Sequence, residues 1–399
     1  MSSVSRLATV VSDVVGAAAP ALDVDVAIVG GGLAGSLAAL ALARRGVRVA
    51  VIDRYDVYPQ QFRCEKLSGP QIALLRELGA LEDFLCAARP FERVLLMREG
   101  RPIGVRALAE SGLSYSDMVN AARRGWPASV AFLQGRVCDI ETSDGRQRVA
   151  CADGRAIEAR LVVLATGPAD KLHARLGLRR RVLREAHSLC SGFSIAPAGG
   201  GGFPFQAMTC FGEKPGDRIG YATLFPMREA MRVNLFTYHE PRGAFAQAMS
   251  ADPLGAMFAA MPSLRNALGQ VRLLGPAETR AIDLYETLDP ARPGLALIGD
   301  AYRSSCPATG TGVTRILTDI RQLALRHAPK WLAAPGMGAE KIAAFYADGA
   351  KMRMERDAAR AAERGRALAV DTSLRWRAAR RLTTMGARLR LAAGVLPGL

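Results

Sequence analysis

The clearest pattern of hydrophobic and polar positions lies near the start of the chain. Residues 24–30 (VDVAIVG) are mostly apolar, as in a strand that is buried on both faces of a parallel sheet. Residues 36–46 (SLAALALARRG) repeat apolar positions with helical spacing and end at a glycine, and residues 47–54 (VRVAVIDR) form a second apolar run. The order strand, glycine turn, helix, strand predicts one βαβ unit of about thirty residues.

Helices and strands alternate in the segment that follows. Residues 71–89 predict a helix with a break at Gly79, and residues 114–125 predict a second helix. Residues 91–108 and 129–167 predict several strands, separated by turns at Glu99-Gly100, Asp144-Gly145 and Asp153-Gly154.

The pattern of hydrophobic and polar positions changes twice in the remainder of the chain. Residues 181–285 contain a run of four glycines, scattered prolines and strand-like stretches, which predicts a mainly antiparallel sheet with a few helices. Residues 294–300 return to a buried-strand pattern, residues 313–328 have helical spacing, and residues 338–391 are helical by composition.

The charge of the chain is strongly positive and unevenly distributed. The 399 residues carry a formal net charge of +16, and the stretch from Ser373 to Leu399 holds arginines but no acidic residue. The sequence contains no zinc finger, RRM motif or recognisable helix-turn-helix, so we expect no nucleic-acid partner and interpret the charge as a solvated surface. The tail repeats apolar residues at helical spacing; we expect them to pack on the protein itself, with weak contact to a membrane surface as the alternative.

The cysteines and the N-terminal segment indicate the compartment. The seven cysteines are odd in number and never spaced CxxC, which argues against a disulfide framework and fits a reducing environment. Residues 1–22 form a leader whose apolar stretch is interrupted by Asp13, so we do not read it as an export signal. No apolar run is long enough to span a membrane. We therefore expect a cytoplasmic protein.

A glycine-rich turn lies inside the βαβ unit. It reads Gly30-Gly31-Gly32-Leu33-Ala34-Gly35 and is followed, at the end of the next strand, by Asp53. In this context the first glycine permits a tight turn, the second lets the backbone approach a pyrophosphate, and the third lets helix and strand pack closely. The helix N-terminus offers unpaired N–H groups to phosphate, and Asp53 can bind a ribose diol.

A second glycine-rich helix start follows much later. A buried strand ends at Gly299-Asp300, and the loop Cys306-Pro307-Ala308-Thr309-Gly310-Thr311-Gly312 leads into a helix. An acid at this place is suited to holding a polyol hydroxyl, and the helix start provides a second anion or dipole site. Both motifs in one chain indicate a long ligand with adenosine and pyrophosphate at one end and a ribityl chain at the other, which is FAD.

Together with Ala165-Thr166-Gly167 at the end of a strand, these motifs resemble the single-component flavoprotein monooxygenases of the aromatic-hydroxylase type over residues 23–325. In that family the acid at Asp300 binds ribitol, the backbone of 310–313 lies along the flavin, Arg63 reaches the pyrophosphate, and the backbone of Val137 meets adenine. We expect FAD contacts from Gly30, Gly32, Leu33, Ala34, Gly35, Asp53, Arg54, Arg63, Val137, Thr166, Gly167, Gly299, Asp300, Gly310, Thr311, Gly312 and Val313.

The chain also departs from this family. Tyr302-Arg303 replaces Ala-His after the GDA motif, Thr166 replaces the acid of the middle motif, and Tyr115 stands where the family has an arginine. The middle motif handles NAD(P)H in the family, so the reductant is either NAD(P)H or a protein electron donor. Residues 63–69 (RCEKLSG) are similar to the geranylgeranyl-reductase-like flavoproteins, which keeps an FAD-dependent reductase as an alternative; a flavin-binding, membrane-docked module without catalysis is a second one.

The resemblance implies transfer of one oxygen atom from O₂ to an organic substrate through a flavin C4a-hydroperoxide. Lys66, Cys306 and Pro307 are the candidates for the reactive face of the flavin. The middle sheet is rich in Phe, Met and Leu, which indicates an apolar, aromatic or polycyclic substrate. The residues that we expect to form its floor, unless they are plain core, are Phe203, Phe205, Met208, Phe225, Met227 and Leu235. No spacing of His, Cys, Asp or Glu indicates a metal site.

We therefore predict an α/β protein with a Rossmann-like FAD-binding domain, an inserted, mainly antiparallel substrate domain and a basic helical C-terminal region. The FAD-binding domain comprises residues 23–180 and 286–330, with strands of 91–108 contributed to the substrate domain. The substrate domain covers residues 181–285, and the C-terminal region covers 331–399.

Overall fold

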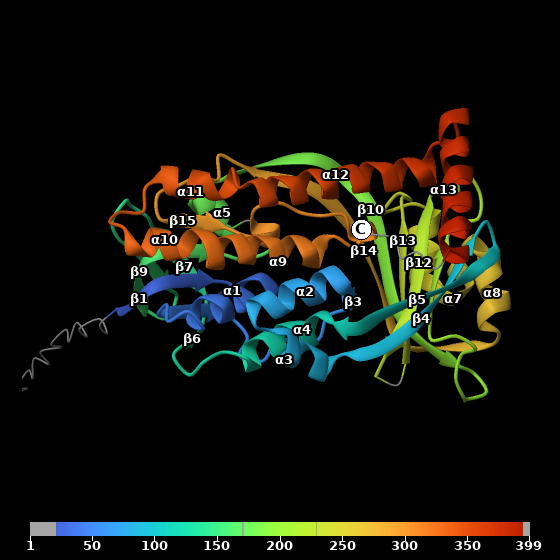
Figure 1. The fold of residues 1–399 in the computed structure, drawn as a ribbon, viewed down its shortest axis with the longest axis horizontal. Coiled ribbons are helices and arrows are strands. Elements are labelled where there is room, and N and C mark those ends of the chain that lie inside the picture. Colours follow the sequence, from blue (N-terminus) through green and yellow to red (C-terminus); the bar gives the residue numbers. More distant parts are fainter. Residues whose placement is uncertain (1–20, 170, 229, 394–399) are drawn as a thin grey trace, which may run out of the picture.

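The protein is an elongated α/β molecule with a mainly parallel sheet at one end and a mainly antiparallel sheet at the other (Figure 1). The computed structural model describes residues 21–169, 171–228 and 230–393. Most of the predicted leader, residues 1–22, lies outside these ranges.

The first sheet has seven strands in the order β6-β2-β1-β9-β8-β7, with β15 also paired to β9. Strands β6, β2, β1, β9 and β15 are parallel to their neighbours, and β8 and β7 extend the sheet with antiparallel pairing. The strands are β1 (Leu22–Val29), β2 (Val49–Asp53), β6 (Ala131–Gln134), β7 (Val137–Glu141), β8 (Gln147–Cys151), β9 (Ala156–Leu164) and β15 (Leu295–Leu297). Val29 is in register with both Ile52 and Leu164, so the carboxyl ends of the three central strands meet at one edge.

Helices cover one face of this sheet. Helix α1 (Leu33–Ala43) is buried along its whole length, because the sheet lies on one side of it and further helices lie on the other. These helices are α2 (Gly69–Leu78), α3 (Leu81–Ala87), α4 (Tyr115–Arg124), α9 (Gly312–Gln322), α10 (Ala328–Ala333) and α11 (Ala339–Tyr346). A π-helical turn, Leu323–His327, joins α9 to α10. The short α5 (Lys171–Arg175) lies at the opposite face.

The second sheet has eight strands in the order β14-β10-β13-β12-β11-β4-β5-β3. Its pairs are antiparallel except for β11 with β4. The strands are β3 (Cys64–Leu67), β4 (Arg89–Arg98), β5 (Arg101–Ser114), β10 (Arg179–Pro197), β11 (Ala207–Phe211), β12 (Ile219–Met227), β13 (Ala230–Thr237) and β14 (Val271–Leu288). Residues 64–67 and 89–114 thus join this sheet, a wider contribution than the predicted 91–108.

Three short helices cover the outer face of the second sheet. They are α6 (Ala244–Ala251), α7 (Pro253–Ala260) and α8 (Pro262–Leu268), and they bury one set of alternating side chains from β11, β12 and β13. Because successive side chains of a strand point to opposite faces, the other set faces the FAD-binding part of the molecule.

The long helix α12 (Gly349–Val370) runs from one sheet to the other, and α13 (Leu374–Ala392) stands at the end distant from the parallel sheet (Figure 1). A buried ion cluster fastens α12 to α9. The Lys351 ammonium lies 2.5 Å from the Asp319 carboxylate, and the Arg315 guanidinium lies 3.0 Å from the Glu355 carboxylate. The same α12 also contacts β12 of the second sheet.

Candidate active site

A cleft opens where the parallel strands end. Because the carboxyl ends of β1, β2, β9 and β15 meet at one edge, the loops that follow them converge there, as ligand sites of open α/β sheets do. Ten of the residues predicted to bind FAD line this cleft: Gly30, Gly32, Leu33, Ala34, Asp53, Arg54, Arg63, Thr166, Gly167 and Asp300. Residues from five separate parts of the sequence therefore share one cavity.

Two glycines of the turn after β1, Gly30 and Gly35, cannot be replaced by a larger residue. Gly30 has a φ of +101°, and a Cβ atom added to it would lie 2.6 Å from the carbonyl oxygen of Ala165. A Cβ on Gly35 would collide with the carbonyl of Gly30. These contacts hold the N-terminus of α1 close to β1, and the helix has no side-chain cap of its own at Gly32. Its first N–H groups point toward the cleft, as required for phosphate binding.

The carboxylate of Asp53 is held at the end of β2 by backbone donors. The N–H of Gly31 donates to one oxygen at 2.7 Å, and the N–H of Tyr55 donates to the other at 2.9 Å. The guanidinium of Arg123, on α4, lies 3.5 Å from the same carboxylate and donates to the carbonyl of Gly31 at 2.6 Å. This contact of Arg123 could not be predicted from the sequence, because an arginine near the end of a helix carries no signal for it.

Arg63 lies in the cleft between the two glycine-rich motifs. Its guanidinium stacks on the ring of Tyr115 at 3.8 Å, and the Tyr115 hydroxyl accepts a hydrogen bond from the N–H of Leu33 at 3.3 Å. Burial opposes the charge of Arg63, but electrostatic attraction from Tyr115 and Asp300 outweighs it and raises the pKa of Arg63. The cation is therefore fixed beside the N-terminus of α1, where it suits a pyrophosphate.

The Asp300 carboxylate points into the cleft from a tight turn. The Asp319 carboxylate accepts the N–H of Gly299 at 3.2 Å, and the Tyr285 hydroxyl donates to the Asp300 carbonyl at 3.0 Å. Within the described residues, no hydrogen bond is made to the Asp300 carboxylate itself, so it remains available to a polyol. The hydroxyl of Thr166 is likewise buried without a hydrogen-bond partner in the described part of the chain.

The remaining predicted FAD residues surround the cleft without lining it. Gly35 packs against the turn, and Val137 lies on β7 opposite Cys151. Gly299 precedes Asp300, while Gly310, Thr311, Gly312 and Val313 form the turn into α9. Gly310 has a φ of +66°, and a Cβ placed there would meet open space. This turn can therefore accept a flat ligand against its backbone.

These residues fit FAD. The turn at Gly30 and Asp53 would hold the adenosine end, Arg63 and the N-terminus of α1 would hold the pyrophosphate, and Asp300 would hold the ribityl chain. The unpartnered Thr166 hydroxyl and the free Asp300 carboxylate are the polar groups that such a ligand would satisfy.

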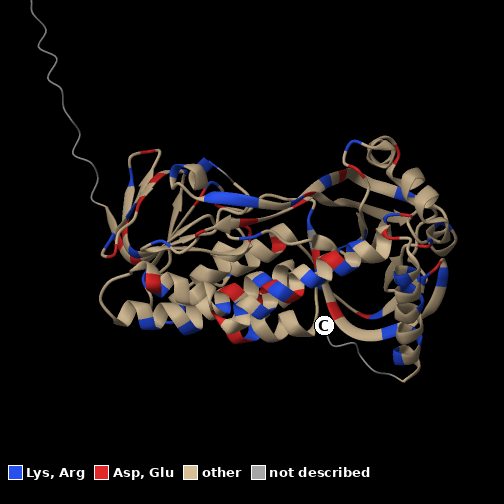
Figure 2. Ribbon diagram, turned by 90° about the horizontal axis from the view of Figure 1, so that it is seen from above, with Lys and Arg blue, Asp and Glu red and all other residues tan. Residues whose placement is uncertain are grey.

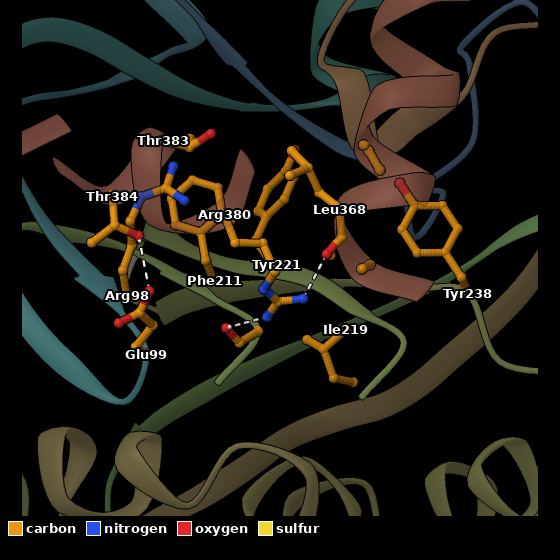
Figure 3. A pocket seen from close by; sticks show the side chains of 15 residues that line it. Arg98, Glu99, Phe211, Ile219, Tyr221, Tyr238, Leu368, Arg380, Thr383 and Thr384 are labelled. Atoms are coloured by element: carbon orange, nitrogen blue, oxygen red, sulfur yellow. Dashed lines mark hydrogen bonds between the residues drawn. The ribbon is translucent and has the colours of Figure 1, made fainter. Parts of the chain in front are cut away.

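A second cavity lies between the second sheet and the C-terminal helices (Figure 3). Its apolar walls comprise Phe211, Ile219, Tyr221, Tyr238, Leu368 and Ala369, and Ala308 of the loop before α9 also lines it. Arg98, Glu99, Arg380, Thr383 and Thr384 form a polar end beside α13 (Figure 3). Arg98 stacks on Phe211 at 3.6 Å, and burial together with nearby arginines lowers the pKa of Arg98 to about 10.

Two phenols line this cavity, and a half-buried carboxyl group lies close to one of them. Burial raises the pKa of Glu65, on β3, to about 7, although Arg63 and Lys66 pull it in the other direction. Burial, and next the proximity of Cys306 and Glu65, raises the pKa of the Tyr221 hydroxyl. Burial also raises the pKa of the Tyr238 hydroxyl. The sequence analysis did not single out these three residues, because only the pairing of distant strands brings them together.

The three predicted catalytic residues occupy different settings. The Lys66 ammonium pairs with the buried Glu110 carboxylate at 3.1 Å. The Cys306 thiol is buried 3.6 Å from the Ser188 hydroxyl, and burial raises the pKa of Cys306. Pro307 starts the short turn that carries Ala308 into the second cavity. Their catalytic roles stay predictions.

Of the six residues considered for the substrate floor, Met208, Phe225 and Leu235 are plain core, which is the alternative stated above, and the other three lie outside the aromatic cavity. Met208 and Leu235 point to the face that α6–α8 cover, because strand alternation turns them away from the FAD-binding part. Phe225 and Met227 pack in a separate cluster around Phe91. Phe203 and Phe205 stack on each other with centroids 5.6 Å apart and lie outside the cavity that contains Ala308. The aromatic wall is instead built from Phe211, Tyr221 and Tyr238.

The described ranges hold neither a cluster of metal ligands nor a membrane-spanning helix. No three side chains of His, Cys, Asp or Glu gather there as ligands for a metal ion. None of the helices within those ranges combines the length and apolar character that crossing a bilayer needs.

The sequence is similar to known proteins. Residues 23–176 match the family described as FAD binding domain. The chain is 26% identical over 352 residues to the ubiquinone hydroxylase UbiL of Rhodospirillum rubrum, covering 81% of this chain and 76% of that protein. It is also 26% identical over 320 residues to the 3-demethoxyubiquinol 3-hydroxylase of Escherichia coli K12, covering 75% and 78%.

A solved structure extends the similarity to the whole fold. The p-nitrophenol 4-monooxygenase PnpA of Pseudomonas putida superposes with a TM-score of 0.74 at 17% identity, over 94% of this chain and 96% of that chain. The predicted fold, with its FAD-binding part, second sheet and helical C-terminal region, is thereby confirmed.

Proposed function

Given that this chain is an FAD-dependent oxidoreductase with the flavoprotein monooxygenase fold, we propose that it adds one oxygen atom from O₂ to an apolar aromatic ring. The observation that carries the proposal is the aromatic cavity between the second sheet and α12, which reaches Ala308 in the loop before α9. Two relatives, named as ubiquinone and demethoxyubiquinol hydroxylases, support a phenol or quinol as the substrate class.

The cavity walls would bind and orient the ring. The ring of Tyr221 lies between those of Phe211 and Phe236, at centroid distances of 5.7 and 4.9 Å. Aromatic side chains attract another ring by apolar burial and by edge-to-face contacts. Tyr238 and Leu368 close the opposite wall, so water would be excluded from a bound ring.

Bound FAD would supply the chemistry of oxygen activation. Among the residues of the chain, we assign proton transfer at a ring hydroxyl to Glu65, because it lies close enough to Tyr221 of the cavity wall to raise the pKa of that phenol, and its own pKa of about 7 suits general acid–base work at neutral pH. Deprotonation of a phenol makes its ring more electron-rich and more reactive toward an electrophilic oxygen. Lys66 and Arg63, which flank Glu65, would stabilise the carboxylate form.

The reaction needs two electrons. In balanced form, the aromatic C–H, O₂, two electrons and two protons give the C–OH product and water. The electrons come from NAD(P)H or from a protein donor. Both donors stay candidates, because Thr166 replaces the acid of the middle motif that handles NAD(P)H in the resembling family. The described cysteines are free thiols, which supports our placement of the enzyme in the cytoplasm.

The test uses the holoprotein reduced by light, so that it does not depend on the electron donor. The reduced enzyme is mixed with ¹⁸O₂ and a short-tailed quinol that has one unsubstituted ring position. We expect one ¹⁸O atom in the product by mass spectrometry. Phe211→Ala should lower the yield, and Phe203→Ala, outside the cavity, should not. Oxidation of the reduced enzyme with hydrogen peroxide as its sole product, for this quinol and for simple phenols, would contradict the proposal.

A further inference from the structure

Helix α13 exposes an apolar stripe instead of burying it. The stripe consists of Leu374, Ala378, Leu382, Met385 and Leu389, which recur every three or four residues and so share one side of the helix. The four large side chains are exposed by 82, 62, 54 and 63%. They are four of the eleven large hydrophobic side chains that are exposed within the described residues, although α13 has only 19 residues.

The opposite side of α13 is the one that packs on the protein. The Thr384 hydroxyl donates to the Glu99 carboxylate at 3.2 Å, and Arg380 donates to the carbonyls of Leu368 at 2.5 Å and Lys214 at 2.8 Å. Leu391 covers Gly104 on β5. These contacts fix the rotation of the helix about its axis. The expectation that the apolar residues of the tail pack on the protein itself is therefore wrong for Leu374, Leu382, Met385 and Leu389, because Leu391 and polar or small side chains make that contact.

Arginines border the exposed stripe on both sides. Arg377, Arg381 and Arg388 lie along one edge and Arg375 along the other, by the angular spacing of a helix, and all four are exposed. Blue segments recur along α13 in Figure 2, and no acidic residue lies between Ser373 and Ala393. An apolar stripe bordered by cations is complementary to a surface that is anionic outside and apolar beneath, which describes an anionic phospholipid layer.

The same helix borders the aromatic cavity. Arg380, Thr383 and Thr384 point from α13 into the polar end of this cavity (Figure 3). They lie on the side of the helix opposite the stripe. A surface that contacts the stripe would thus lie one helix diameter from the cavity. No helix of the described ranges can cross a bilayer, so any attachment through α13 would be parallel to the lipid surface.

We propose that α13 docks the protein on an anionic phospholipid surface, with Leu374, Leu382, Met385 and Leu389 among the acyl chains and the flanking arginines at the phosphates. Docking would place the cavity beside the lipid, where a substrate with a long apolar tail resides. This last step rests on the proposed function, whereas the docking itself does not.

The test is co-sedimentation of the full-length holoprotein with vesicles of phosphatidylcholine, with or without phosphatidylglycerol. We expect binding to the anionic vesicles that weakens as salt is raised. The triple variant Leu382→Ser/Met385→Ser/Leu389→Ser should bind these vesicles at least about tenfold more weakly than the parent protein. The matched control, Val57→Ser/Leu85→Ser/Val182→Ser, changes equally exposed apolar residues elsewhere and should bind like the parent. FAD content checks that both variants are folded.

Two outcomes overturn the docking: no binding of the parent protein to anionic vesicles, or equal binding by the parent and the α13 variant. The proposed function is judged separately. The α13 variant should hydroxylate a short-tailed quinol in solution as the parent does, and should be slower only with a long-tailed quinol embedded in vesicles. Failure with the short-tailed quinol in both proteins counts against the monooxygenase proposal and leaves the vesicle result intact.

Discussion

Three half-buried carboxyl groups of this molecule differ because their neighbours differ. Asp53 accepts two backbone N–H groups, which hold its carboxylate at the end of β2. Asp300 lies in the cleft with a cation nearby and no hydrogen bond from the described residues, so it is ready to bind a hydroxyl-rich ligand. Glu65 is desolvated, and its pKa rises to about 7. The first two groups suit binding, and the third suits proton transfer.

Replacing Asp300 by alanine should weaken FAD binding without unfolding the protein. A hydrogen bond to a charged group contributes about 1.5–3 kcal/mol, which corresponds to a tenfold to hundredfold loss of affinity. Titration of the apoprotein with FAD, followed by flavin fluorescence, measures the change. Asp289→Ala, at an exposed ion pair with Arg179, is the control and should bind FAD normally. Unchanged affinity in Asp300→Ala would remove this residue from the site.

Glu65 should make the stability of the protein depend on pH in a defined direction. Its folded pKa of about 7 exceeds its ordinary value of 4.5, so the folded state holds a proton that the unfolded state releases. The contribution of Glu65 to the free energy of unfolding should therefore be greatest below about pH 4.5. It should fall as the pH rises to about 7, by at most about 3 kcal/mol.

Urea unfolding of Glu65→Gln across that range measures the effect. The glutamine variant should gain stability relative to the parent as pH rises, while Glu240→Gln, at an exposed position, should follow the parent. Parallel curves for parent and Glu65→Gln would show that the carboxyl ionises as in water.

At the scale of elements, locally encoded structure could be predicted and tertiary pairing could not. The first βαβ unit follows from spacing within thirty residues, and Gly79 ends α2 in a left-handed conformation, as the break in the pattern indicates. The ion cluster between α9 and α12 had no such signal. Lys351 and Glu355 look like a surface pair of a charged helix, and only the packing of α12 on α9 shows that they are buried.

The same limit applies to the candidate site. The residues around Gly30 and Asp300 could be found because each motif is contiguous and has a local physical purpose. The wall of Phe211, Tyr221 and Tyr238 depends on which face of the second sheet meets the FAD-binding part. Helices α6–α8 cover one face of the second sheet, so the other face meets the FAD-binding part. The alternation of side chains along a strand does not show which face the helices cover.

Breaking the ion cluster should be costly. Lys351→Ala would leave the buried Asp319 carboxylate without its cation, and loss of one partner of a buried pair typically destabilises by about 3–5 kcal/mol. Thermal or urea unfolding should show this loss, whereas Lys330→Ala at an exposed position of α10 should change stability little. A loss in Lys351→Ala no larger than that of the control would show that water reaches the cluster.

At the scale of the whole molecule, few elements connect the two sheets. The long strands β10 and β14 pair with each other and extend toward the parallel sheet, and α12 lies across both parts (Figure 1). At one end of α12, Lys351 pairs with Asp319 of α9, whose carboxylate fixes the N–H of Gly299 beside Asp300. The other end contributes Leu368 and Ala369 to the aromatic cavity.

This arrangement of α12 has a thermodynamic consequence, because a rigid rod with one end at each ligand makes the two binding equilibria dependent on each other. By reciprocity, a phenol that binds the cavity and tightens α12 must raise the affinity for FAD by the same factor by which FAD raises the affinity for the phenol. We expect a factor of about five or more, measurable as two dissociation constants for FAD, without and with a saturating phenol. Identical constants would mean that α12 bends between its ends, and that the cofactor end of the molecule does not sense what occupies the other end.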